Sequence, residues 1–263
     1  MSEEQNIFQL SWSLDADLKA KPAEAQLAED YSLLSSIAAG EKNPTLRLWC
    51  SDPAIVVGTA EKRLPTFQHS VDDLAKKQWQ VITRRTGGTA FILTPHILNI
   101  SAVQLLRSKN LSIDRCYEDF CGLVMLALRD MGVDTRLGFQ NRAFCDGKYN
   151  ILVGNKKLAG TAQRWARSNN QSLTAVLAQA SIFVSIDSKE VSQLINEFYR
   201  KAGSNKHYDA DAIIDLRLAL ESINPKHNLH KLAADDIQKK LAELIQLRFC
   251  SSPTARAQSH LHA

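Results

Sequence analysis

Apolar and polar positions follow a helical period in several segments along the chain. After Pro22, apolar residues recur on one face of a predicted helix that Gly40 ends. Ser112 opens a second long helix that ends at Gly132. Further helices are expected from Ser70 and, roughly, at 188–200, 210–222 and 233–248.

The middle of the chain carries extended patterns. Strands are expected at 46–50, 54–58, 80–85, 90–103, 149–153, 156–165 and 174–186. Gly154-Asn155 predicts a two-residue hairpin turn, which sets Lys157 opposite Leu152. Because these strands do not alternate regularly with helices, the expected fold class is α+β, with a mixed, largely antiparallel sheet packed with helices.

Domain organisation follows from the lack of any linker rich in Pro, Gly or Ser. We expect an N-terminal segment at 1–22, a catalytic core at 23–187 and a helical C-terminal part of the same domain at 188–250. Residues 251–263 are polar and are expected to form a flexible tail.

Composition narrows the class of protein. The 263 residues are 44% hydrophobic and 23% charged, which is ordinary for a globular domain. Neither a signal peptide nor an apolar run long enough to cross a membrane is visible, so a cytoplasmic location is expected. Cysteine and histidine spacings match no metal motif, and the net charge of +4 comes from scattered basic residues. We therefore expect no metal site, nucleic-acid partner or membrane partner.

The segment RRTGGTA at 84–90 is the first candidate for chemistry. Arg84 and Arg85 supply fixed positive charge, while Gly87 and Gly88 let the backbone approach a ligand closely. A hairpin turn flanked by surface arginines is the competing interpretation.

Cys145 is the candidate nucleophile. The following Asp146-Gly147 predicts a turn, so the cysteine lies on a loop, and the nearby Arg142 and Lys148 would favour its thiolate. A buried structural thiol is the alternative. The other four cysteines lie in apolar runs and are expected to be structural.

Lys157 lies just after the hairpin turn, where most lysines are solvated edge residues. It can meet Cys145 only if the Asp146-Gly147 turn folds the loop back over the sheet.

Two stretches together resemble the biotin/lipoate-protein ligase superfamily. They are RRTGG…ILNIS (84–101) and FCDGKYNILVGNKKLAGTAQR (144–164), and the resemblance covers roughly residues 24–185. Within the superfamily they are most similar to the cysteine-dependent octanoyltransferases, in particular those that use octanoylated glycine-cleavage H protein. The order of the segments and the twelve-residue spacing from Cys145 to Lys157 carry this likeness.

The resemblance implies a fold like that of class II synthetases and biotin/lipoate ligases, with the acyl chain in a tunnel behind the diglycine loop. It implies that Cys145 is the nucleophile and that Lys157 stabilises the oxyanion. The substrate-binding residues that it implies are Arg84, Arg85, Gly87, Gly88, Thr89 and Gly160. The implied reaction moves an octanoyl or lipoyl group from an acylated donor, glycine-cleavage H protein or acyl-carrier protein, to a lipoyl-domain lysine. It requires no cofactor.

The chain departs from the superfamily pattern at three places. Thr89 stands where the ligases have a third glycine, Leu93-Thr94 replaces a common His-Asp pair, and His96 replaces a glycine. Two alternatives therefore stay open. One is an ATP- and Mg-dependent lipoate ligase that uses the RRTGG loop and Lys157 without catalysis by Cys145. The other is an inactive member that only binds acyl groups.

Overall fold

The computed structural model describes residues 7–8, 11–84, 88–107, 112–223 and 228–250. Within these residues the larger sheet has seven strands in the order β1-β2-β6-β10-β9-β8-β7. The strands are β1 (Ser13–Lys21), β2 (Thr45–Ser51), β6 (Ile97–Arg107), β10 (Leu173–Phe183), β9 (Lys156–Arg167), β8 (Asn150–Val153) and β7 (Arg136–Gly138). Strand β1 runs parallel to β2 and the other neighbours are antiparallel, which confirms the predicted α+β fold with a largely antiparallel sheet.

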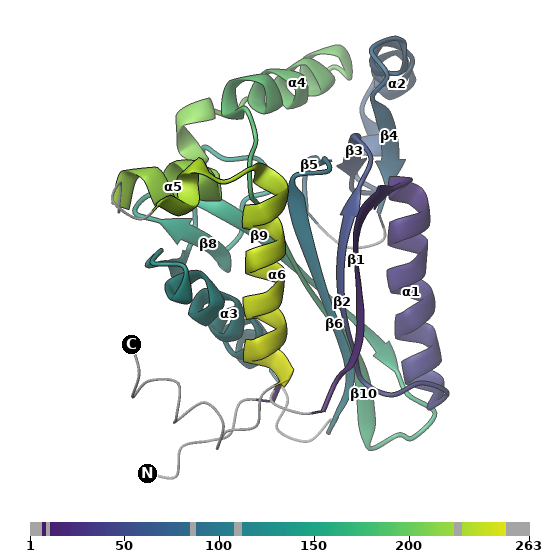
Figure 1. Cartoon of the computed structure of the whole chain (residues 1–263). Coiled ribbons are helices and arrows are strands. Elements are labelled where there is room, and N and C mark those ends of the chain that lie inside the picture. The colour runs from purple at the N-terminus through teal and green to yellow at the C-terminus, as the bar shows by residue number, and fades with distance from the viewer. Residues whose placement is uncertain (1–6, 9–10, 85–87, 108–111, 224–227, 251–263) are drawn as a thin grey trace.

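A second, three-stranded sheet lies at one end of the molecule (Figure 1). Its central strand β3 (Ala54–Val57) pairs parallel with β4 (Gln80–Thr83) and antiparallel with β5 (Phe91–Leu93). Helices α2 (Phe67–Lys76) and α4 (Ser188–Lys201) pack beside it.

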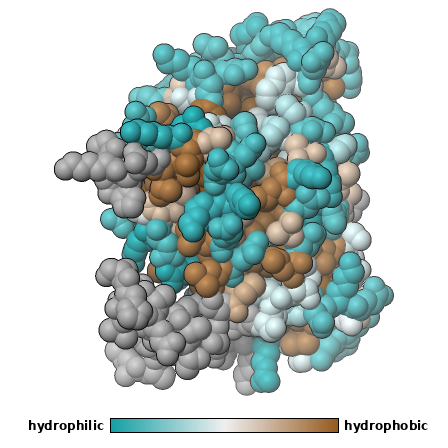
Figure 2. Space-filling model, in the orientation of Figure 1, coloured by the Kyte–Doolittle hydropathy of each residue, from teal (hydrophilic) through white to brown (hydrophobic). Residues whose placement is uncertain are grey.

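Helices cover both faces of the larger sheet (Figure 1). Helix α1 (Ala23–Ala39) lies on one face, and α3 (Ile113–Asp130), α5 (Leu216–Ile223) and α6 (Ala234–Cys250) lie on the other. Figure 2 shows hydrophilic and hydrophobic side chains interspersed on this side of the molecule. Because successive strand residues point to opposite faces, Leu46 and Leu48 of β2 join the core beneath α3 and α6, whereas Arg47 and Trp49 face α1.

Several local predictions hold. Helix α1 ends where Gly40 takes a left-handed φ of 81°, and the Ser112 side chain caps α3 by accepting from the Arg115 N–H. The hairpin register is also confirmed, since Lys157 pairs with Leu152.

Other predicted elements were wrong in extent. The run 90–103 forms two strands, β5 and β6, which the segment 94–96 with its central Pro95 separates. Helix α2 begins at Phe67, before Ser70. Ser70 does not cap it, because the Ser70 hydroxyl donates to the Phe198 carbonyl of α4.

The expected helix at 210–222 is interrupted as well. It consists of a 3₁₀ turn, Ala210–Ala212, followed by α5, since residues 213–214 are extended and the Ile214 N–H donates to the Lys157 carbonyl. Strands β1 and β7 were not predicted, and the expected tail 251–263 lies outside the described residues.

Candidate active site

Lys157 is buried at the start of β9. Its side chain has no exposed area, which excludes the interpretation as a solvated edge lysine. The ammonium Nζ donates to the carbonyl of Phe144 at 2.9 Å and to that of Cys145 at 2.6 Å. The loop that carries Cys145 therefore folds back over the sheet, as contact between Cys145 and Lys157 requires.

The chain reverses at Cys145 itself, not at the predicted Asp146-Gly147 turn. Cys145 has a φ of 48°, in the left-handed region that non-glycine residues rarely enter, whereas Gly147 is not among the residues with positive φ. Both flanking peptides are held, because the Cys145 N–H donates to Thr89 Oγ1 at 2.9 Å and its carbonyl accepts from Lys157. Such strain persists where neighbouring groups hold the backbone, which is common in functional sites.

Arg84 places a positive charge in contact with the sulfur. Its Nη2 donates to Cys145 Sγ at 3.2 Å and to the Thr89 carbonyl at 2.8 Å, and the side chain is almost wholly buried. The predicted role of Arg142 and Lys148 was wrong: Arg142 pairs with Asp209 and Asp211, and Lys148 pairs with Asp114. Both cations therefore pair with these carboxylates and not with the Cys145 thiol.

Burial and the neighbouring charges shift the pKa values of Cys145 and Lys157. Burial by itself raises the pKa of the Cys145 thiol, but the charges of Arg84 and Lys157 outweigh it and leave that pKa below its ordinary value. Burial lowers the pKa of Lys157 to about 8. By contrast, burial raises the pKa of Cys50 and of Cys116 to about 12, as fits structural thiols.

Gly88 packs closely against Arg84 and Cys145. Gly88 has a φ of 104°, and a Cβ there would stand 2.5 Å from Arg84 Nη2 and 2.8 Å from Cys145 Sγ. Only glycine fits at this position. Gly160 lies beside the Lys157 ammonium, since a Cβ added at this position would stand 3.3 Å from Lys157 Nζ. The predicted binding residues Arg85 and Gly87 lie outside the described residues.

Three residues outside the motifs, Glu61, Tyr199 and Tyr208, support the segment 89–90 and were not predicted from the sequence. The Tyr199 hydroxyl accepts from the Ala90 N–H at 2.8 Å and donates to Glu61 at 3.0 Å, while the Tyr208 hydroxyl donates to Thr89 Oγ1 at 3.3 Å. These contacts orient the Thr89–Ala90 peptide so that its carbonyl faces Arg84. No local pattern marks these residues, because they come from segments distant in the sequence.

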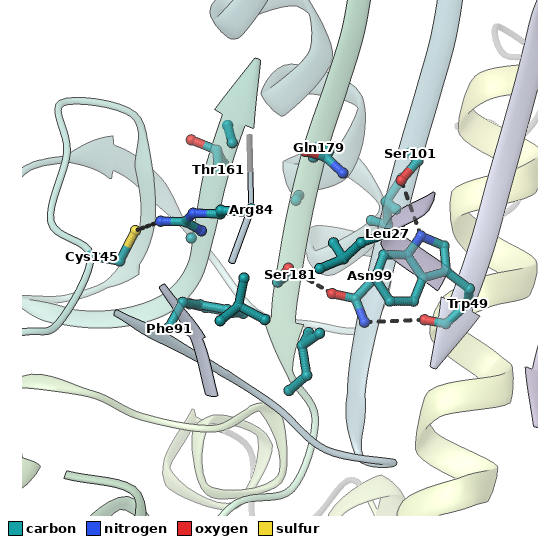
Figure 3. Close-up of a pocket in the computed structure, with 16 residues that line it drawn as sticks. Leu27, Trp49, Arg84, Phe91, Asn99, Ser101, Cys145, Thr161, Gln179 and Ser181 are labelled. Atoms are coloured by element: carbon teal, nitrogen blue, oxygen red, sulfur yellow. Dashed lines mark hydrogen bonds between the residues drawn. The ribbon is translucent and has the colours of Figure 1, made fainter. Parts of the chain in front are cut away.

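A cavity opens from the Cys145–Arg84 pair and passes between the larger sheet and α1 (Figure 3). Its lining is mostly apolar side chains and strand backbone, with several polar side chains from alternate positions of the strands. The lining residues are Leu27, Trp49, Val56, Arg84, Phe91, Leu93, Asn99, Ile100, Ser101, Cys145, Gly160, Thr161, Ala162, Gln179, Ala180 and Ser181. A concave site of this kind beside a thiol of lowered pKa suits an apolar substrate.

The departures from the superfamily pattern have different places in the structure. Thr89 contacts the backbone of Cys145, and Leu93 lines the cavity, so both belong to the site. His96 does not line the cavity, and its Nε2 lies 3.2 Å from Asp235 Oδ1. In the described part of the chain, no cluster of His, Cys, Asp or Glu is arranged to hold a metal ion, and no helix has the length and apolar character to span a membrane.

Comparison with known proteins places this site in a family. The model of the lipoyl protein ligase A/B catalytic domain matches residues 22–242. The chain belongs to this family. An octanoyl-GcvH:protein N-octanoyltransferase of Oceanobacillus iheyensis is 26% identical in an alignment of 251 residues that covers 92% of this chain and 85% of the relative. The Bacillus velezensis protein of the same name is 31% identical over 79% of this chain and 71% of the relative.

The fold agrees with this membership. A crystal structure of lipoate-protein ligase A bound with ATP superimposes with a TM-score of 0.63 at 20% identity. The match covers 91% of this chain and 85% of the ligase chain. The lipoate-ligase fold predicted from the sequence motifs is therefore present.

Proposed function

We propose that this family member transfers an octanoyl or lipoyl group, through a thioester on Cys145, to the lysine of a lipoyl-domain protein. One observation carries the proposal: a thiol with a lowered pKa, held between Arg84 and Lys157, lies at the mouth of a largely apolar cavity. The names of the relatives support the substrate, since they are octanoyltransferases that use GcvH.

The first half-reaction forms the acyl-enzyme. The Cys145 thiolate attacks the carbonyl carbon of the N-acyl-lysine on the donor, and the carbonyl becomes a tetrahedral oxyanion. The Lys157 charge stabilises this oxyanion, and a positioned donor of this kind is typically worth about 3 kcal/mol in the transition state. When the C–N bond breaks, the donor lysine leaves as an amine and takes up a proton. An ammonium with a pKa of about 8 can supply that proton near neutral pH.

The second half-reaction reverses these roles. The acceptor lysine attacks the thioester carbonyl as a free amine, the C–S bond breaks, and the Cys145 thiolate returns. The amine loses one proton, which Lys157 in its neutral form can accept. Because one amide is exchanged for another, the reaction requires neither ATP nor Mg. The same steps serve an acyl-carrier-protein thioester as donor, with a thiol as the leaving group.

Intact-mass spectrometry tests the proposal. The protein is mixed with octanoylated glycine-cleavage H protein or octanoyl-acyl-carrier protein, without ATP, and an apo lipoyl domain is then added. We expect an octanoyl adduct on Cys145 that moves to the acceptor lysine. Cys145→Ala should abolish both, whereas Cys250→Ala, which removes an exposed cysteine of α6, should retain both.

Three outcomes would reject the proposal. Full transfer by Cys145→Ala would exclude the thioester. Formation of acyl-adenylate from lipoate and ATP, with acceptor modification that needs ATP, would favour the ligase. An adduct or bound acid that never reaches the acceptor would indicate an inactive acyl-binding member.

A further inference from the structure

Strand β4 has a free edge at one side of the three-stranded sheet. Within the described residues it pairs with β3 alone, in parallel, because the strand order is β4-β3-β5. In this ladder the Arg84 N–H donates to the Val57 carbonyl, so Ile82, two positions earlier, also directs its backbone groups toward β3. Val81 and Thr83 therefore direct their N–H and carbonyl groups away from the sheet. A free edge of this kind is a template for pairing with another chain.

A groove runs along this edge, between β4 and the first turns of α1. Figure 1 shows β4 just beyond the N-terminal end of α1. The groove has a volume of about 340 Å³ and is lined by Glu24, Leu27, Ala28, Tyr31, Lys62, Gln80, Val81, Ile82 and Thr83. All four residues of β4 line it, although successive side chains of a strand point to opposite faces. The groove therefore follows the backbone edge of the strand and not one face of the sheet.

The groove leads to the Cys145 thiol. Strand β4 continues directly into Arg84, whose guanidinium contacts Cys145 Sγ at 3.2 Å. On the opposite wall, Leu27 of α1 lines both the groove and the cavity that opens from Cys145. A strand added to β4 would therefore have one end beside the thiol, where the proposed reaction requires the lysine side chain of another protein.

The groove suits a short extended segment of a protein. Its walls carry one charge of each sign, on Glu24 and Lys62. Along β4, the backbones of Val81 and Thr83 each offer one donor and one acceptor, which do not suit the apolar chain of a lipid. The edge has only four residues, which give too little surface for a stable dimer of this chain but fit a substrate that dissociates after each turnover.

We infer that a lipoyl-domain protein docks in this groove by adding an extended segment, close in sequence to its acyl-accepting lysine, to the free edge of β4. The inference rests on the proposed acyl transfer and identifies the surface that brings the protein substrate to the thiol. The segment exchanges backbone hydrogen bonds with Val81 and Thr83, and these bonds fix its register. The register determines how far the lysine reaches toward Cys145, so a small-molecule amine bypasses the groove.

Amide hydrogen exchange tests the docking without chemistry. Cys145→Ala is mixed with an excess of apo lipoyl domain, and exchange is followed by mass spectrometry in peptides that cover 80–84. Exchange at Val81 and Thr83 should slow by about fivefold or more, because each N–H gains a hydrogen bond. Protection that instead appears without lipoyl domain, as the enzyme concentration rises, would assign the edge to a second copy of this chain and overturn the inference.

Kinetics with two classes of acceptor test the same contact. The octanoyl enzyme is prepared with a small-molecule octanoyl thioester, and its rate of transfer to apo lipoyl domain is divided by its rate with the amide of Nα-acetyl-lysine. Val81→Pro removes one outward N–H, which an edge strand tolerates, and should lower this ratio about fivefold or more. Val81→Thr keeps the N–H and the branched shape and should keep the wild-type ratio.

A substitution on the opposite wall leaves β4 unchanged. Ala28→Trp fills the groove from α1 and should lower the ratio about tenfold or more, because its ring occupies the space of the added segment. Ala25→Trp is the matched control, since Ala25 is also exposed on α1 but does not line the groove.

The two experiments separate this inference from the proposed function. If peptides 80–84 are protected in Cys145→Ala but wild type transfers no acyl group, the function fails and the docking surface stands. If wild type transfers the acyl group, but 80–84 gain no protection and Val81→Pro and Ala28→Trp keep the wild-type ratio, the inference is overturned. Should Val81→Pro not fold, the ratio in Ala28→Trp decides.

Discussion

The buried ammonium of Lys157 makes a prediction about stability. Burial lowers its pKa from 10.5 to about 8. Between these two values the unfolded chain binds a proton that the folded chain does not, so the free energy of unfolding rises with pH in this window. The difference of about 2.5 units corresponds to about 3 kcal/mol, at 1.36 kcal/mol per unit.

Lys157→Met isolates this contribution. Methionine fills similar space and does not titrate, so the stability of wild type relative to the variant should increase by about 3 kcal/mol from below pH 8 to above pH 10.5. The variant also leaves the Phe144 and Cys145 carbonyls without their donor, which is a loss that does not vary with pH. Groups that titrate independently of Lys157, such as Cys50 and Cys116, cancel in the comparison.

Cys145 does not cancel, because its thiolate raises the pKa of Lys157. The comparison is therefore repeated in a Cys145→Ala background, where the rise should begin at lower pH and become larger.

Urea unfolding followed by tryptophan fluorescence at intervals from about pH 7 to about pH 11 provides the free energies. Lys156→Met, which removes the exposed neighbouring ammonium, is the matched control and should show no such rise. A stability difference between wild type and Lys157→Met that stays constant with pH would refute the assignment of a desolvated lysine.

Three further variants test how the thiolate is held. Arg84→Met should raise the pKa of Cys145, so that the pH midpoint of its alkylation by iodoacetamide moves upward; an unchanged midpoint would exclude Arg84 as the main counter-charge. Gly88→Ala should slow Cys145 acylation by at least about tenfold, because the added Cβ at a φ of 104° displaces the Arg84 guanidinium, and wild-type rates would contradict the close approach. Tyr199→Phe leaves the Ala90 N–H without its acceptor and should lower the free energy of unfolding by about 1–3 kcal/mol, with an upward shift of the alkylation midpoint. Loss of stability without that shift would limit Tyr199 to a structural role.

Local chemistry made much of the fold predictable. Gly40 ends a helix because glycine adopts a positive φ without strain, and Ser112 caps one because its hydroxyl accepts an N–H of the first turn. The two-residue turn at Gly154-Asn155 likewise determines which residue faces Lys157. The errors arose where distant contacts override local preference, as where Ser70 bonds Phe198.

Part of the candidate site was likewise predictable from the sequence, and part was not. From the sequence we identified Cys145 and Lys157 as candidates, twelve positions apart, and a hairpin of defined register limits where both can lie. The sequence did not indicate which cations reach the sulfur: Arg142 and Lys148 are neighbours in the chain but pair with carboxylates, whereas Arg84, which is 61 positions away, contacts it.

Sequence alone thus predicted the candidate residues Cys145 and Lys157 and the hairpin that carries Lys157, because motif spacing and turn chemistry act over a few residues. Only the tertiary structure decided which cation contacts the Cys145 thiol, the desolvation of Lys157 and the residues that line the cavity. The physical reason is that electrostatic energy and available space depend on distances between strands and loops, which packing sets and which no local pattern of residues records.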